Sequence, residues 1–208
     1  MKANDKVTQS AMTPVDARTK LEEGNARFCA RNGATRDLMG QMNDTKGGQW
    51  PFAAIVGCID SRVSPELVFD QGIGDVFSAR VAGNIVNGDI LGSLEFACKV
   101  AGSKLIVVLG HERCGAVMGA CDDVQLGQLT GLLDKIKPAI KATDSPADAG
   151  ERNSKNRDFV HNVAVQNVHL TTAKILADSD VLREMEKAGE IAVVGAMYDV
   201  ETGKVTFV

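Results

Sequence analysis

Aromatic residues are scarce in this chain. They make up 4% of its 208 residues, with one Trp and one Tyr, so branched aliphatic residues and Ala must fill the core. The chain is 44% hydrophobic, and a chain of this length ordinarily forms one domain. We expect that domain over residues 14–208, preceded by a disordered or flexible N-terminus over residues 1–13.

Long apolar runs, basic charge and a cysteine framework are also missing. No run approaches the roughly 20 apolar residues that cross a bilayer. The net charge of -4 gives no electrostatic reason to expect nucleic acid or a membrane as partner. Five Cys, an odd number without tight spacing, do not form a disulfide scaffold. Residues 1–13 lack a signal peptide's apolar middle, so we expect a cytoplasmic protein, or a periplasmic one if a signal peptide was removed.

Short apolar runs alternate with helical patterns along the chain. The runs at residues 52–57, 104–109 and 191–197 are rich in branched residues, as in strands buried on both faces of a parallel sheet, and a further strand is expected at residues 75–80. Helices are expected at 14–31, 37–48, 64–69, 89–100, 114–121, 126–142 with a break near Pro138, 158–176 and 179–188. A turn then leads to a hairpin strand at 205–208. The pattern predicts an α/β fold: a mainly parallel four-stranded sheet with an added C-terminal edge strand, flanked by helices.

Two of the predicted strands end on residues that bind metals. The first strand runs into GCIDSR and the third into GHERC. Because the carboxyl ends of parallel strands meet at one edge of a sheet, Cys58, Asp60, His111 and Cys114 should lie together. Two Cys and one His suit zinc and leave a fourth position for Asp or water. The pattern indicates a catalytic metal site, while a structural zinc site or simply buried thiols remain open as alternatives.

The two motifs together resemble the β-class carbonic anhydrases. Cys58-x-Asp60-x-Arg62 is followed about fifty residues later by His111-x-x-Cys114. Similar stretches run from residue 14 to residue 208, among them NARF at 25–28, ARVAGN at 79–84, GSLEFA at 92–97 and GAMYDVETG at 195–203. The resemblance implies a carbonate dehydratase that hydrates carbon dioxide reversibly to bicarbonate and a proton by zinc-bound hydroxide, with one Zn²⁺ per subunit.

The resemblance also implies roles for the motif residues. Cys58, His111 and Cys114 would hold the zinc. Asp60 would take the fourth position in a closed state, or be held by Arg62 through charge-assisted hydrogen bonds, which leaves that position to water. Asp60 would then orient the hydroxide. Two thiolates leave the zinc less positive than three His would, so activity should rise toward alkaline pH.

Residues farther from the metal resemble the plant-like, open-site subgroup. Gln49 matches a glutamine that donates a hydrogen bond to substrate, and Phe77 matches an apolar pocket residue. In the family both come from the neighbouring subunit, which implies a homodimer or a dimer of dimers with the site at the interface. The subgroup regulated by bicarbonate carries a tryptophan three residues before the first Cys ligand, where this chain has Ile55.

Three more positions belong to the implied substrate pocket. Gly115 matches a small residue beside the last ligand. Phe96 replaces a tyrosine of plant-like members, and Ala82 replaces a larger apolar residue. These two departures leave the metal ligands intact and are expected to affect rate and inhibitor preference.

Other interpretations remain open. A non-enzymatic module would use zinc for assembly or bicarbonate sensing, although a purely structural site needs no releasable ligand such as Asp60. Hydrolysis of carbonyl sulfide or carbon disulfide would need similar residues around the metal. Gln49 is alternatively a surface residue. His161 and His169 are candidates for the proton shuttle that the reaction requires, with solvated histidines as the simpler alternative.

Overall fold

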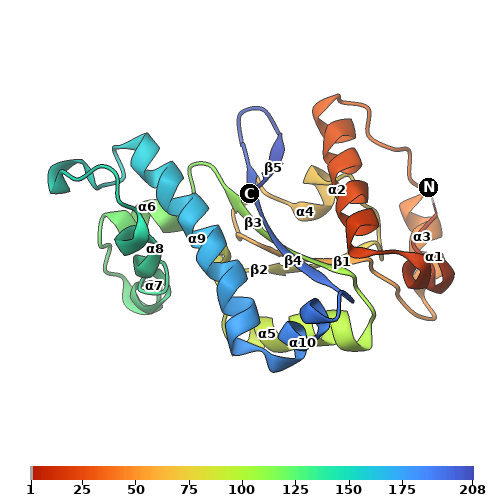
Figure 1. The fold of residues 1–208 in the computed structure, drawn as a ribbon. Coiled ribbons are helices and arrows are strands. Elements are labelled where there is room, and N and C mark those ends of the chain that lie inside the picture. Colours follow the sequence, from red (N-terminus) through yellow and green to blue (C-terminus); the bar gives the residue numbers. More distant parts are fainter. Residues whose placement is uncertain (1) are drawn as a thin grey trace.

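The computed structural model describes residues 2–208 (Figure 1). Its strands are β1 (Ala53–Gly57), β2 (Val76–Arg80), β3 (Leu105–His111), β4 (Ala192–Tyr198) and β5 (Val205–Phe207). Its α-helices are α1 (Lys6–Ala11), α2 (Pro14–Cys29), α3 (Leu38–Thr45), α4 (Pro65–Val68), α5 (Gly88–Glu95), α6 (Gly115–Cys121), α7 (Gly127–Leu133), α8 (Lys137–Ala142), α9 (Arg157–Asp178) and α10 (Asp180–Lys187). Two short 3₁₀-helices, η1 (Ala82–Asn84) and η3 (Ala149–Glu151), and one π-helical turn, η2 (Phe96–Val100), complete the described elements.

The five strands form one sheet in the order β2-β1-β3-β4-β5. The first four are parallel, and β5 pairs antiparallel with β4 at the edge. The predicted sheet and its C-terminal edge strand are therefore confirmed. In the register of β1 and β3, Gly57 lies opposite Leu109, so the two strands end side by side.

Helices cover both faces of the sheet because side chains along each strand alternate between two cores. Ile55 and Val107 point into one core with α2 and α4. Val56 and Val108 point into the other, where α5, α6, α8, α9 and α10 pack. Figure 1 shows α2 and α4 on one side of the sheet and the long α9 crossing the other. Each fully buried aliphatic side chain contributes about 1.5–3 kcal/mol.

Local sequence explains where several helices begin and end. Thr13 and Asp16 form a reciprocal capping box at the start of α2, with Pro14 in the first turn. The predicted helix over residues 126–142 is divided into α7 and α8, with Pro138 in the first turn of α8, where a missing N–H costs no helical hydrogen bond. No helix among residues 2–208 combines the length and apolar character required to cross a membrane.

The N-terminus differs from its prediction. Residues expected to be disordered form α1, capped by the side chain of Asp5. Gln9 is 5% exposed, and its side-chain amide donates to the carbonyl oxygens of Pro51 and Ala101, both at 2.7 Å. These contacts with distant residues order the segment, whereas its own sequence is polar and short. Met1, which belongs to the same predicted segment, lies outside the described residues.

Candidate metal centre

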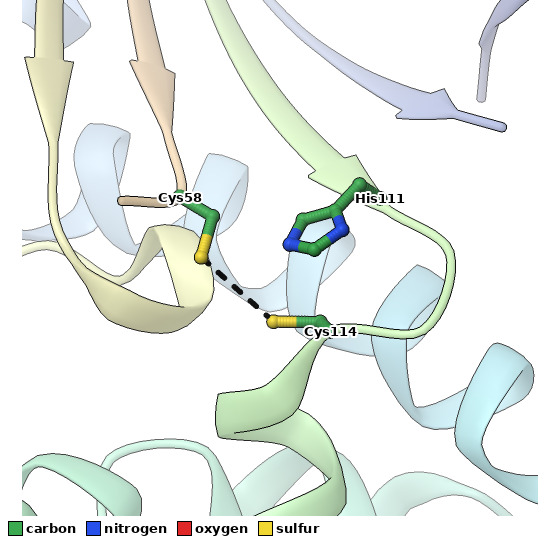
Figure 2. A group of neighbouring side chains, drawn as sticks. All are labelled: Cys58, His111 and Cys114. Carbon is green, nitrogen blue, oxygen red and sulfur yellow. Dashed lines mark hydrogen bonds between the residues drawn. The ribbon is translucent and has the colours of Figure 1, made fainter. Parts of the chain in front are cut away.

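Three predicted ligands converge at the carboxyl edge of the sheet (Figure 2). Cys58 follows β1, His111 ends β3, and Cys114 is the N-cap of α6. All three side chains are buried, and their donor atoms lie within 4.8 Å of one another. The Sγ atoms of Cys58 and Cys114 are 3.9 Å apart. Three donors of the types that zinc prefers therefore face a common point.

The His111 ring is oriented for metal binding by its own backbone neighbour. Its Nδ1 lies 2.9 Å from the carbonyl oxygen of Glu112, so Nδ1 carries the proton and donates it to that oxygen. The lone pair is then on Nε2, which is buried and has no hydrogen-bond partner. An unsatisfied buried nitrogen costs about 1–3 kcal/mol. A metal ion would remove that cost, which is the arrangement expected of a histidine ligand.

The two thiols at the centre influence each other strongly. Contact with Cys114 lowers the pKa of Cys58, with a further contribution from His111. The pKa of Cys114 is raised by the same contact and by burial. The two sulfurs thus compete for one proton whenever no cation is bound between them. A divalent cation would replace that proton and stabilise both thiolates.

Asp60 and Arg62 form the predicted pair. The Nε and Nη2 atoms of Arg62 donate to Oδ1 and Oδ2 of Asp60 at 2.9 and 2.7 Å, and the Arg62 backbone N–H donates to Oδ1 at 2.9 Å. These hydrogen bonds lower the pKa of Asp60 to about 2 despite its partial burial, so the carboxylate stays charged near neutral pH. Asp60 is not one of the three groups whose donor atoms converge, which are Cys58, His111 and Cys114.

Two residues near the ligands had no role assigned from the sequence. The guanidinium of Arg80 donates to the carbonyl oxygens of Cys58 and Asp60, at 2.8 and 2.6 Å. The Gly83 N–H donates to Cys58 Sγ at 3.4 Å. Arg80 lies at the end of β2 and is paired with Gly57 in the register. This position places its side chain beside the residues that follow β1. The signal available in the sequence was their position in the ARVAGN stretch.

The predicted pocket residues fall into two groups. Ala82 begins η1, the turn whose Gly83 contacts Cys58, and Gly115 begins α6 directly after Cys114. Phe77 and Phe96 lie farther from the candidate metal ligands, and their rings pack edge to face with centroids 6.2 Å apart. They line a groove of about 750 Å³ along β2 and α5.

Gln49 is not close to the metal ligands within this chain. It is exposed and precedes β1, whereas Cys58 follows the opposite end of the same strand. Phe77 also lies toward the end of the sheet that is opposite the metal ligands. Its partner in the register is Ala54, near the start of β1.

The two candidate shuttle histidines lie on α9. His161 is about half exposed and its Nδ1 lies 2.6 Å from Glu112 Oε1, in a cleft of about 660 Å³ beside the loop that carries His111 and Cys114. His169 is exposed, two turns farther along the helix. Of the two, His161 is nearer to the metal loop.

Fold and site together define an α/β protein with a candidate metal site of three protein donors at the edge of a parallel sheet. The pattern of the family described as carbonic anhydrase matches residues 53–205. Carbonic anhydrase 2 of Mycobacterium tuberculosis is 36% identical over 197 residues, covering 92% of this chain and 91% of that relative. The carbonic anhydrase of Mycolicibacterium smegmatis is 35% identical over 199 residues, covering 92% of each.

Solved structures agree with the sequence relatives. A tetrameric β-carbonic anhydrase of Sordaria macrospora superimposes with a TM-score of 0.68 at 28% identity, covering 78% of this chain and 82% of that one. The β-carbonic anhydrase CafA of Aspergillus fumigatus gives 0.71 at 25% identity, covering 93% and 89%. The chain belongs to the carbonic anhydrase family, in its β class. It is therefore an enzyme of the lyase class, a carbonate dehydratase.

Proposed function

We propose that this carbonic anhydrase hydrates carbon dioxide reversibly to bicarbonate and a proton at one Zn²⁺ per subunit, held by Cys58, His111 and Cys114. The observation that carries the proposal is the convergence of two thiol sulfurs with the buried, unpartnered Nε2 of His111. Zinc accepts this donor set, and three protein ligands leave a coordination position for chemistry.

The catalytic roles follow from the polar contacts around the ligands. When bound, zinc supplies a Lewis acid that lowers the pKa of water toward neutrality. Asp60 accepts a hydrogen bond from the reacting water, because its Oδ2 accepts one bond from Arg62 and retains a lone pair. Arg62 keeps Asp60 ionised and away from the fourth position. We therefore propose the plant-like, open-site subgroup, which the two-pronged Asp60–Arg62 contact supports.

The substrate pocket would be completed by a second copy of the chain. We assign Ala82 and Gly115 to the pocket from the same subunit, and Gln49 and Phe77 from the neighbouring one, where Gln49 donates a hydrogen bond to substrate. The separation of Gln49 from Cys58 along β1 supports this, as do the tetrameric relatives from Sordaria macrospora. Phe96 packs on Phe77 and belongs to the same apolar wall. We propose a homodimer or a dimer of dimers.

We also propose a cytoplasmic location. The five cysteines are all free, which suits a reducing compartment. Recovery of the protein in the periplasmic fraction of fractionated cells would favour the alternative.

A pair of cysteine variants tests the zinc assignment. Cys58→Ala removes one donor and should abolish both stoichiometric zinc and carbon dioxide hydration. Cys98→Ala is the matched control, because Cys98 is equally buried but lies in η2, away from the metal point, and burial raises its pKa to about 12. Zinc content by elemental analysis and stopped-flow hydration are measured for both. Full activity in zinc-free Cys58→Ala protein would refute the assignment.

A further inference from the structure

Asn167 is a polar residue on the buried face of α9. Its neighbours on that face are apolar, among them Val163, Ala164 and Val168, and Asn167 itself is 3% exposed. Burying an amide among such side chains is unfavourable unless the amide is hydrogen-bonded. Asn167 Nδ2 donates to the carbonyl oxygen of Gly83 at 2.9 Å. The amide therefore holds a particular backbone group across the core.

Gly83 is the centre of the turn η1 and has a conformation that other residues rarely adopt. Its φ is +70° and its ψ is 19°, in the left-handed region. A Cβ at this position would lie 2.6 Å from Cδ1 of Ile136, which is fully buried. The same residue's N–H donates to Cys58 Sγ. Its carbonyl oxygen is thus held by α9, and its N–H is held by the sulfur of Cys58.

We propose that Asn167 is a positioning residue of the metal centre, which holds η1 so that the Gly83 N–H remains directed at the Cys58 sulfur. The inference rests on the proposed zinc function. An N–H donor withdraws electron density from a thiolate, and outer hydrogen bonds of this kind tune metal affinity and the acidity of the metal. Asn167 touches neither metal nor substrate, and acts through Gly83.

Loss of the amide should have a recognisable effect on the metal. Without Asn167 the turn loses its anchor, the Gly83 N–H···Sγ bond weakens, and Cys58 donates more charge to the ion. The metal becomes a weaker Lewis acid, so the alkaline rise in activity should move to higher pH. Metal affinity should nevertheless fall, because η1 no longer holds Cys58 in place for the ion; we expect a loss of about tenfold, the lower end of what such outer contacts usually contribute.

The test uses Co²⁺, which binds tetrahedral Cys and His donors and reports on them by its absorption spectrum. Asn167→Leu is close in shape and removes the donor without opening a large cavity; Asn167→Ala is the second variant if the first does not fold. Thr171→Val is the matched control, because Thr171 lies one turn along the same buried face and is 5% exposed. Folding is checked by circular dichroism, metal affinity by chelator competition.

The expected result is a shift of the thiolate-to-cobalt band to lower energy and about tenfold weaker Co²⁺ binding in the Asn167 variants, with Thr171→Val matching the wild type. A wild-type spectrum and affinity in a folded Asn167 variant would overturn the inference. Equal shifts in the Asn167 and Thr171 variants would also overturn it, since they would indicate a general packing effect. Failure of the wild-type protein to bind Co²⁺ or Zn²⁺ would instead refute the proposed function.

Discussion

At the scale of single residues, Asp60 is the group whose partner, in the proposed function, decides whether the fourth zinc position is open. Its carboxylate accepts three hydrogen bonds from Arg62, two of them from the guanidinium. Arg62 also donates to the carbonyl oxygen of Arg113 at 3.3 Å, which links the two ligand loops. A planar guanidinium suits both contacts, and a lysine would lose the paired geometry.

Removal of the Arg62 side chain should therefore close the site. In Arg62→Ala protein Asp60 has no competing cation, and it should occupy the fourth zinc position. We expect zinc to remain bound and carbon dioxide hydration to fall at least about tenfold, with Arg62→Lys intermediate. Stopped-flow assays and zinc analysis on the same samples separate loss of activity from loss of metal. A faster Arg62→Ala enzyme would contradict the role given to Arg62.

At the scale of elements, Asp70 connects α2 and the segment that follows it to the end of α4 through ion pairs and hydrogen bonds. Its carboxylate, which is 9% exposed, accepts a bond from Arg27 Nε at 2.6 Å, one from the Ala34 N–H at 3.1 Å, and one from Arg36. Burial alone would raise the pKa of Asp70, but the hydrogen bonds from Arg36 and Arg27 outweigh it and hold the pKa below its usual value. Ionised Asp70 therefore stabilises the fold.

This network predicts a pH-dependent effect of Asp70→Asn. Because the folded-state pKa lies below the unfolded one, the stabilisation is present above about pH 4 and is lost as pH falls through the folded pKa. Near pH 7 the substitution should cost about 3 kcal/mol. Asn tolerates the positive φ of 46° at this position, so the backbone is not strained.

Urea denaturation near pH 7 and near pH 3 measures the difference between Asp70→Asn and wild type. The difference should shrink at the lower pH. Asp44→Asn, a substitution at an exposed position in α3, is the control and should be neutral at both. An equal penalty at both pH values would show that the carboxylate's charge is not what stabilises this region.

At the scale of the whole molecule, much of the fold follows from local sequence. The strands were predictable because apolar runs such as residues 105–109 are buried on both faces, and the ligand pairing followed from the meeting of strand ends. The folding of residues 6–11 into α1 was not predictable, since it depends on contacts of Gln9 with Pro51 and Ala101. The contacts of Gly83 with Cys58 and with Asn167 could not be predicted either, because they join residues that are 25 and 84 positions apart in the sequence.

Under the proposed function, the arrangement of the sheet would leave the site of one chain incomplete. The metal ligands lie at the carboxyl ends of β1 and β3, whereas Gln49 precedes β1. Side chains at opposite ends of one strand cannot meet within the same subunit. The proposed contribution of Gln49 therefore depends on assembly, which no feature of a single chain reports.

The most direct test of the account is stopped-flow carbon dioxide hydration by zinc-quantified protein, scanned from about pH 7 to about pH 9. Arg62 binds Asp60, which in the proposed function leaves a zinc position for water, so we predict turnover already near pH 7 that rises with pH. Activity that is absent below about pH 8 and present above it would contradict the open-site assignment. No activity at any pH, with zinc fully bound, would contradict the proposed function itself.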